Sequence, residues 1–370
     1  MGSHLPPLFS ERVNVVIFYD FEVFKEDWLA VFIDVTKKKE YVIINNPDEL
    51  KALYEANSKD IWVGYNNRHY DQYIMKGILL GMNPKRINDW IIVEKKEGWQ
   101  FSSAFNKVPM INYDVMPNPP VGLKTLEGFL GSNIKETDVD FRINRKLTKE
   151  EIEMTVFYCR HDVEETIKVF LEKIDEFNAM HGIIQAFPDI VNLSDIGDSE
   201  ARITAKVLGC TRRSFEDEFD FYFLPCLQLK KYKYVQDWFE QKRQEALSMD
   251  LAHMDKYSKR TWYKEQGLET VVAGIPHSFG FGGVHGATAE PIHKTGQLLH
   301  VDVNNYYPSM LIAWGLVTRA ATNDNYPLVY NTRKAMKEKQ IAAKNAGNKK
   351  EVKRWKKAQL PYKKMLNALS

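Results

Sequence analysis

The most informative stretch of the chain opens with a run of apolar residues and closes on two acids: Val15-Val16-Ile17-Phe18-Tyr19-Asp20-Phe21-Glu22. A continuous apolar run rich in β-branched residues predicts a strand that is buried on both faces. Asp20 and Glu22 lie two residues apart, so their side chains share one face of that strand. Two carboxylates that converge at a sheet edge suit Mg²⁺ or Mn²⁺. A loop with solvent-facing acids is the alternative for this stretch taken alone.

The pattern that follows predicts strands and helices in alternation. We expect further strands at 28–35, 41–44, 61–65 and 107–115. We expect helices at 47–57, 71–81, 122–131 and 149–177, with two more at 199–208 and 230–243. This order of elements indicates an α/β domain at the front of the chain.

Three polar residues of interest, Asp71, Tyr158 and Asp162, fall on the predicted helices. Asp71 lies in the first turn of its helix, where the helix dipole favours an acid. Thr148 and Glu151 form a capping box that opens the long helix. On that helix Tyr158 and Asp162 stand four residues apart, on one face. The apolar stripe beside this face consists of Val156, Cys159, Val163, Ile167 and Phe170. Asp162 is therefore expected to look along the sheet edge toward the first strand.

Composition limits the class of protein. A chain of 370 residues is too long for one ordinary core, so two or three domains are expected. Three cysteines are too few and too scattered for a disulfide framework or a zinc site, which fits a cytoplasmic setting. No apolar run approaches the ~18 residues of a membrane span. The net charge is only +2, but the last 40 residues are strongly basic, and such a patch attracts phosphates.

The acidic stretches share an order and spacing with a known family. Asp20-Phe21-Glu22, Asn67 with Tyr70-Asp71, and Tyr158 to Asp162 resemble the three motifs of the proofreading 3′–5′ exonucleases of the DEDDy type. The stretch Leu123–Gly131 is similar to the helix between that family's second and third motifs. The resemblance implies a ribonuclease-H-like fold and two metal ions, Mg²⁺ or Mn²⁺, ~3.5–4 Å apart on the scissile phosphate.

The same resemblance implies a role for each acid. Asp20 would bridge both ions, Glu22 and Asp162 would bind one of them, and Asp71 would hold the other, partly through water. Asp114 also ends an apolar strand, but the family pattern has no place for it, so we assign it no role.

Three further residues would serve the substrate at this site. Tyr158 would orient the attacking water by a hydrogen bond. Asn67 and Phe21 would hold the unpaired 3′ end of a DNA strand, as stacking platforms do for single strands. Core or capping roles are the alternative for Asn67 and Phe21.

A second constellation lies near residue 300. The glycine-rich stretch 278–286 contains Gly282 and Gly283, too many glycines for a strand interior. It is followed by Leu298–Ser309, an apolar run that ends in Asp302 and turns through Tyr307-Pro308 into a helix near Met310. This resembles motif A of the family B DNA polymerases. The resemblance implies that Asp302 binds the catalytic metals, that Tyr307 packs under the sugar, and that the glycine turn touches the template strand.

Two basic helices, at about 331–346 and from 349 onward, complete the chain. A solvated helical hairpin is one interpretation. The other is a resemblance to the polymerase fingers, with Lys363 and Asn367 matching the start of motif B. Arg333, Lys337 and Lys363 would then grip a triphosphate. Motif B normally has serine where Ala368 stands and tyrosine where Ser370 stands, so steric checking by that tyrosine is not expected here.

Together these patterns predict α/β and α+β architecture in four segments. They are a 3′–5′ exonuclease domain at 10–178, an unassigned bridge at 179–266, a partial palm at 267–330 and a fingers hairpin at 331–370. The expected protein is part of a family B, phage-like DNA polymerase, working on single-stranded 3′ ends and primer–template DNA in a phage-infected bacterial cytoplasm, with no membrane partner.

Asp302 alone supplies too few carboxylates for polymerisation, so we expect at most weak dNTP binding and a second polypeptide that carries the rest of the palm and thumb. The alternatives are a stand-alone exonuclease on DNA or RNA and a catalytically silent nucleic-acid-binding fragment.

Overall fold

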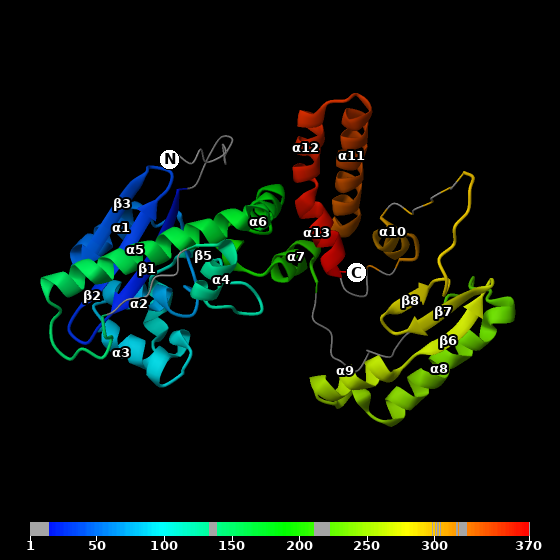
Figure 1. Cartoon of the computed structure of the whole chain (residues 1–370), viewed down its shortest axis with the longest axis horizontal. Coiled ribbons are helices and arrows are strands. Elements are labelled where there is room, and N and C mark those ends of the chain that lie inside the picture. Colours follow the sequence, from blue (N-terminus) through cyan, green and yellow to red (C-terminus); the bar gives the residue numbers. More distant parts are fainter. Residues whose placement is uncertain are drawn as a thin grey trace. The chain divides into compact units, whose positions relative to one another are not determined.

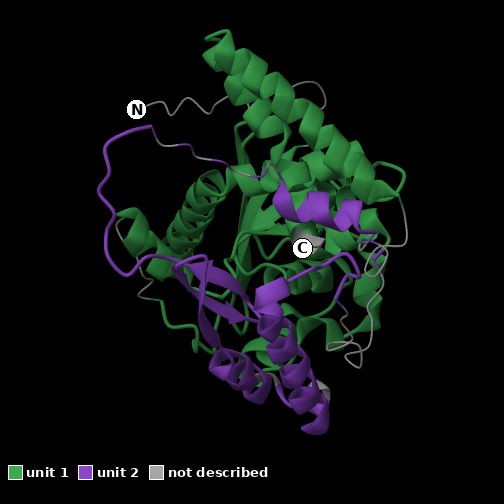
Figure 2. Ribbon diagram, turned by 90° about the vertical axis from the view of Figure 1, so that its right-hand side faces the viewer, with its two compact units in different colours: residues 1–209, 323–370 green, residues 210–322 purple. Residues whose placement is uncertain are grey.

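The protein is described from a computed structural model that covers residues 15–132, 139–210, 223–297, 305–315 and 324–369, together with positions 299, 301, 303 and 317. The chain divides into two compact units, coloured separately in Figure 2. Unit 1 comprises residues 1–209 and 323–370, and unit 2 comprises residues 210–322. This division differs from the four expected segments, because the C-terminal helices pack on the helices near residues 180–208.

Unit 1 is built on a five-stranded mixed sheet (Figure 1). Its strands are β1 (Val16–Val23), β2 (Trp28–Asp34), β3 (Lys39–Ile44), β4 (Ile61–Gly64) and β5 (Ile111–Asp114). Their order is β3-β2-β1-β4-β5, with β1 at the centre. β2 runs antiparallel to both β1 and β3, whereas β1, β4 and β5 are parallel. The mixed α/β class expected from the sequence is therefore confirmed.

The two faces of β1 are covered by different helices. Residues 17, 19, 21 and 23 join a core with the helices α1 (Pro47–Ala56), α2 (Asp71–Leu79) and α3 (Pro84–Asn88). The opposite face, which carries residues 18, 20 and 22, meets the long helix α5 (Lys149–Glu172). Phe18 packs edge-on against Phe170 of α5, with ring centroids 5.2 Å apart. Alternation along β1 thus turns its two acids toward α5.

Most expected elements of unit 1 form, with shifted ends. The strand expected at 107–115 begins only at Ile111, because Pro109 has no N–H to give to a neighbour. The helix expected at 149–177 stops at Glu172, and α6 (Ile174–Ala186) continues after a bend at Lys173. Between α2 and β5 the chain runs through α3, a π-helix (Asp89–Val93) and two 3₁₀ turns (Gly98–Gln100 and Ser103–Lys107).

The last helices of the chain belong to unit 1. They are α11 (Asn325–Asn345), α12 (Lys349–Ala358) and α13 (Leu360–Leu369). α11 begins earlier than expected, because Pro327 falls in its first turn, where a missing N–H costs nothing. α13 packs on α6 and on α7 (Glu200–Leu208), and Lys364 of α13 pairs with Glu200 at 2.7 Å.

Unit 2 holds α8 (Lys233–Ser248), α9 (Lys256–Glu265), a three-stranded antiparallel sheet and α10 (Tyr306–Ala313). The strands are β6 (Leu268–Val272), β7 (Ile275–Gly280) and β8 (Gly283–Gly286). The expectation that 278–286 has too many glycines for a strand interior is wrong, because β7 and β8 form a hairpin in which Gly280, Gly283 and Gly286 are paired strand residues. Gly283 takes a φ of +145°, a value that side chains rarely allow.

The strand expected before Asp302 is not seen in the described residues. Leu299, Val301 and Val303 have no regular structure there and are exposed. A strand needs a neighbour to accept its backbone hydrogen bonds, and none of the described strands pairs with these residues.

Candidate active site

Three of the expected acids meet where β1 faces α5. Asp20 and Glu22 of β1 and Asp162 of α5 each present a carboxylate oxygen, and these oxygens all lie within 4.8 Å of one another. α5 is held against β1 at this point, since the buried Cys159 thiol donates to the Asp20 carbonyl oxygen at 3.5 Å. Asp162 was expected to face the first strand, and in the structure its side chain does face β1.

Asp71, the fourth expected acid, is the first residue of α2 and is 3% exposed. Its Oδ1 accepts the backbone N–H of Phe21 at 3.2 Å, so it lies beside β1 between the positions of Asp20 and Glu22. Asp114 instead binds the backbone, because its carboxylate accepts N–H groups of Asn66, Arg68 and Met116 at 2.9–3.2 Å. Asp114 thus shapes the loop that leads into α2.

The acids of the cluster lie close together and are at least partly buried, so their negative charges are not fully balanced in the metal-free protein. Burial, and then the charge of Asp162, raise the pKa of Asp20 to about 7. Burial followed by the Asp20 charge raises the pKa of Glu22 and of Asp71 well above the ordinary range of carboxyls. Like charges close together cannot all ionise without a compensating cation. A divalent ion bound among these oxygens would supply that compensation.

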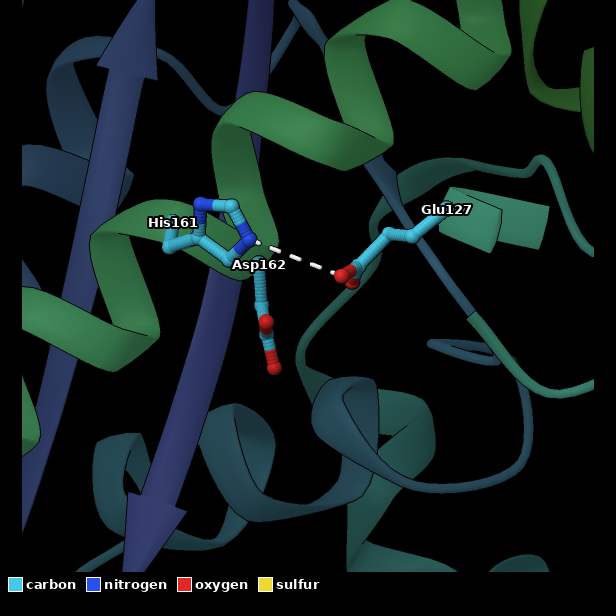
Figure 3. A group of neighbouring side chains, drawn as sticks. All are labelled: Glu127, His161 and Asp162. Carbon is cyan, nitrogen blue, oxygen red and sulfur yellow. Dashed lines mark ion pairs between the residues drawn. The ribbon is translucent and has the colours of Figure 1, made fainter. Parts of the chain in front are cut away.

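Lys124 is the cation that the sequence interpretation missed. It stands on α4 (Leu123–Leu130), and its ammonium lies 2.5 Å from an Asp162 oxygen and 3.2 Å from a Glu127 oxygen. Glu127 is fully buried and also lies 3.5 Å from Nε2 of His161, the pair drawn in Figure 3. Glu127, His161 and Asp162 form a second group whose ligand atoms lie within 4.8 Å of one another. The spacing of Lys124 and Glu127 on one helix face was visible in the sequence, but their partners on α5 were not.

Two of the expected substrate contacts are placed in the core instead. Phe21 is 3% exposed and packs edge-on against Phe32, on the face of β1 opposite to Asp20. Asn67 is fully buried, and its amide donates to Asn112 Oδ1 at 2.9 Å. Because both side chains are buried, neither offers a surface to a DNA end. This corrects the expectation that Phe21 and Asn67 contact the 3′ end. Tyr158 is partly exposed, one turn before Asp162 on α5.

The basic residues of the expected fingers hairpin converge. Arg333, Lys337 and Lys363 line one hollow of about 370 Å³ between α11, α12 and α13. Three further lysines that the sequence interpretation did not single out also line it: Lys353, Lys356 and Lys357. Asp175 is the one acid on the wall, 3.9 Å from Lys357. Asn367 is exposed and is not among the lining residues.

The expected palm residues belong to unit 2. Asp302 lies outside the described residues. Tyr307 is 64% exposed in the first turn of α10. Phe281 and Gly282 form the turn of the β7–β8 hairpin, and Gly283 is the first residue of β8. The Phe281 ring packs on Trp262 in a small core, with ring centroids 5.5 Å apart. No described helix is long and apolar enough to cross a membrane.

Comparison with known proteins adds no identification, since no family model and no curated protein matches the chain.

Proposed function

We propose that unit 1 is a metal-dependent 3′–5′ exonuclease of ribonuclease-H-like fold that acts on single-stranded DNA ends. One observation carries the proposal: Asp20, Glu22 and Asp162 converge within 4.8 Å from two elements distant in sequence. The buried Asp71 beside β1 adds the fourth acid of the family pattern. The raised pKa of Asp20 fits a site that functions with a divalent cation bound.

The donor set suits Mg²⁺ or Mn²⁺, because it consists of carboxylate oxygens only. A bound pair of ions would stabilise the attacking and leaving oxygens of the phosphodiester. Asp20, Glu22, Asp162 and Asp71 would hold the metal, and the Asp20 charge acts on both Glu22 and Asp71. Tyr158 would hold the attacking water by a hydrogen bond. Lys124 holds positive charge at Asp162 and would favour an anionic phosphate there.

We further propose that the chain is related to the phage-like, family B DNA polymerases. The hollow that gathers Arg333, Lys337 and Lys363 supports a triphosphate-binding role for the hairpin. For Asp302 and Tyr307 the proposal depends on the sequence alone. The competing proposals are an exonuclease that works alone on DNA or RNA and a silent nucleic-acid-binding protein.

The test is digestion of a single-stranded oligonucleotide labelled at its 5′ end, with Mg²⁺ or Mn²⁺ supplied. A ladder that shortens from the 3′ end is expected, and it should vanish with EDTA and in Asp20→Ala. Asp189→Asn, which alters an exposed acid far from the cluster in sequence, serves as the control and should digest normally. An RNA strand in parallel separates the DNA-specific enzyme from the broader one. If Asp20→Ala digests as fast as the parent protein, the assignment is wrong.

A further inference from the structure

A hollow of about 760 Å³ lies in unit 1 on the segment that links α2 to β5, away from the acid cluster. Its wall combines aromatic rings, lysines and neutral polar groups. It is lined by Tyr73, Lys76, Trp90, Lys96, Trp99, Gln100, Ser102, Ser103, Phe105 and Asn106. None of these ten residues is acidic, so the wall favours an anionic ligand with a flat apolar part.

The hollow is separate from the proposed nuclease centre, although α2 contributes to both. Tyr73 and Lys76 follow Asp71 by two and five residues, which at about 100° per residue turns them about 200° and 140° away from it. Asp71 faces β1, whereas Tyr73 packs on Phe105 of the linking segment, with ring centroids 5.4 Å apart. A ligand here would therefore not touch the carboxylates.

Lys76 is the first sign of a missing ligand. Its side chain is partly buried, and burial alone lowers its pKa. Among the described residues, no carboxylate or other acceptor pairs with its ammonium. Lys96 differs, since it pairs with Glu94 at 2.7 Å while lying over the Trp90 ring at 3.9 Å. An unpaired lysine held in a sheltered wall is stabilised by an anion that enters from solvent.

Trp99 is the second sign. Its indole is 62% exposed at the rim and stacks on no other described ring. The preceding residue, Gly98, packs closely against the Tyr73 ring, since a β-carbon at Gly98 would lie 2.2 Å from that ring. Trp90 is fixed in the wall by its indole N–H, which donates to the Glu97 carbonyl at 3.1 Å. One indole is thus anchored and the other is left free to receive a flat partner.

We propose that this hollow binds a nucleotide, free or as one unit of a single strand, with its base on the indole of Trp99 and its phosphate on Lys76. Aromatic platforms beside positive charge are how proteins hold unpaired nucleotides without reading their sequence. The volume is within the range of small-ligand sites and is larger than one base requires, which leaves room for the sugar and phosphate. The proposal goes beyond the nuclease assignment and does not depend on it.

The experiment is photo-cross-linking of the full chain in EDTA, so that no digestion occurs. One probe is a 3′-blocked single strand that contains 5-bromodeoxyuridine, and the other is 5-bromodeoxyuridine monophosphate. Cross-linked peptides are then mapped by mass spectrometry. We expect a cross-link within residues 90–106 that falls about tenfold in Trp99→Ala and severalfold in Lys76→Gln. Tyr257→Ala, another exposed aromatic, and Lys51→Gln, another exposed lysine, are the matched controls and should leave it unchanged.

The two probes identify the source of the ligand. A cross-link with the strand alone assigns the hollow to nucleic acid, and one with the monophosphate alone assigns it to free nucleotides. Either result supports the shared chemistry. The proposal is overturned if both probes label other parts of the chain but not residues 90–106, or if the label there persists in both Trp99→Ala and Lys76→Gln. Because metal is absent throughout, a failure here is independent of a failure of the nuclease assay.

Discussion

Replacing Asp20 with asparagine is expected to stabilise the metal-free protein while removing its response to Mg²⁺. The substitution keeps the shape of the side chain and removes one negative charge from a cluster that has too many. The pKa of the Asp20 carboxyl is raised from 3.8 to about 7 by burial and by Asp162. A functional acid should cost stability in this way when its ligand is absent, whereas an ordinary structural acid should not.

The magnitude follows from linkage. The difference between 3.8 and about 7 corresponds to about 4 kcal/mol, at about 1.36 kcal/mol for each tenfold change. Because the folded protein binds this proton more tightly than the unfolded chain, the stabilisation is complete below pH 3.8 and is lost as the pH rises through about 7. Water around a partly buried carboxylate reduces the cost, so we halve it to about 2 kcal/mol at pH 8. For a unit of this size that corresponds to a melting midpoint about 4–8 °C higher in Asp20→Asn.

Scanning calorimetry at pH 5 and pH 8, with and without 10 mM Mg²⁺, makes the measurement. At pH 8 without metal, Asp20→Asn should melt above the parent protein, and at pH 5 the difference between them should be less than half as large. Mg²⁺ should raise the midpoint of the parent protein at pH 8 and leave the variant unchanged. The reasoning is refuted if the variant melts at or below the parent at pH 8 and Mg²⁺ shifts both alike. Asp189→Asn should follow the parent throughout.

The parts of the site that the sequence predicted are those set by short-range periodicity. Alternation along β1 puts Asp20 and Glu22 on one face, and the helical repeat puts Tyr158 and Asp162 on one side of α5. Both rules are local, so both could be read without a structure. The contact between α5 and β1 required one more step, which the apolar stripe around Cys159 supplied.

The same rule also shows why one expectation failed. If Asp20 and Glu22 face α5, then Phe21 between them must face the other way, into the core with Phe32. The family resemblance gave Phe21 a substrate contact, but alternation along the strand already opposed it. Asn67 is a different case, because its burial depends on Asn112, 45 residues away, and no local pattern indicates such a partner.

The structure of residues 84–107 could not be predicted from the sequence, for a physical reason. Apolar periodicity identifies regular helices and strands, and this segment is a short helix, a π-helix and two 3₁₀ turns. Its rings meet through tertiary contacts such as that of Trp90 with Phe101, at 5.7 Å between centroids. Lys124 was missed for a similar reason, since its acidic partner Asp162 is 38 residues away.

Three further predictions concern the two charged sites of unit 1. Tyr158→Phe should slow digestion by about tenfold to a hundredfold and leave the affinity for Mn²⁺, measured by calorimetry, unchanged, because a hydrogen bond to water is lost but no ligand is. Lost Mn²⁺ affinity would show that the residue is structural. Lys124→Met should move the acidic limb of the pH–rate profile to higher pH. Burial raises the pKa of Asp162 and Lys124 partly offsets that rise, so without Lys124 the carboxyl holds its proton, which a metal must displace, up to a higher pH. An unshifted profile would contradict this reasoning. Lys353→Gln should weaken dNTP binding and also flatten its dependence on salt, because Lys353 lines the same hollow as Arg333 and Lys363 and each lysine removed takes away one screened attraction to the phosphates. Titration of a labelled dNTP at 50 and 200 mM salt measures both effects, with Lys51→Gln as the control. If Lys353→Gln binds as tightly as the parent protein at 50 mM salt, the hollow does not hold the triphosphate.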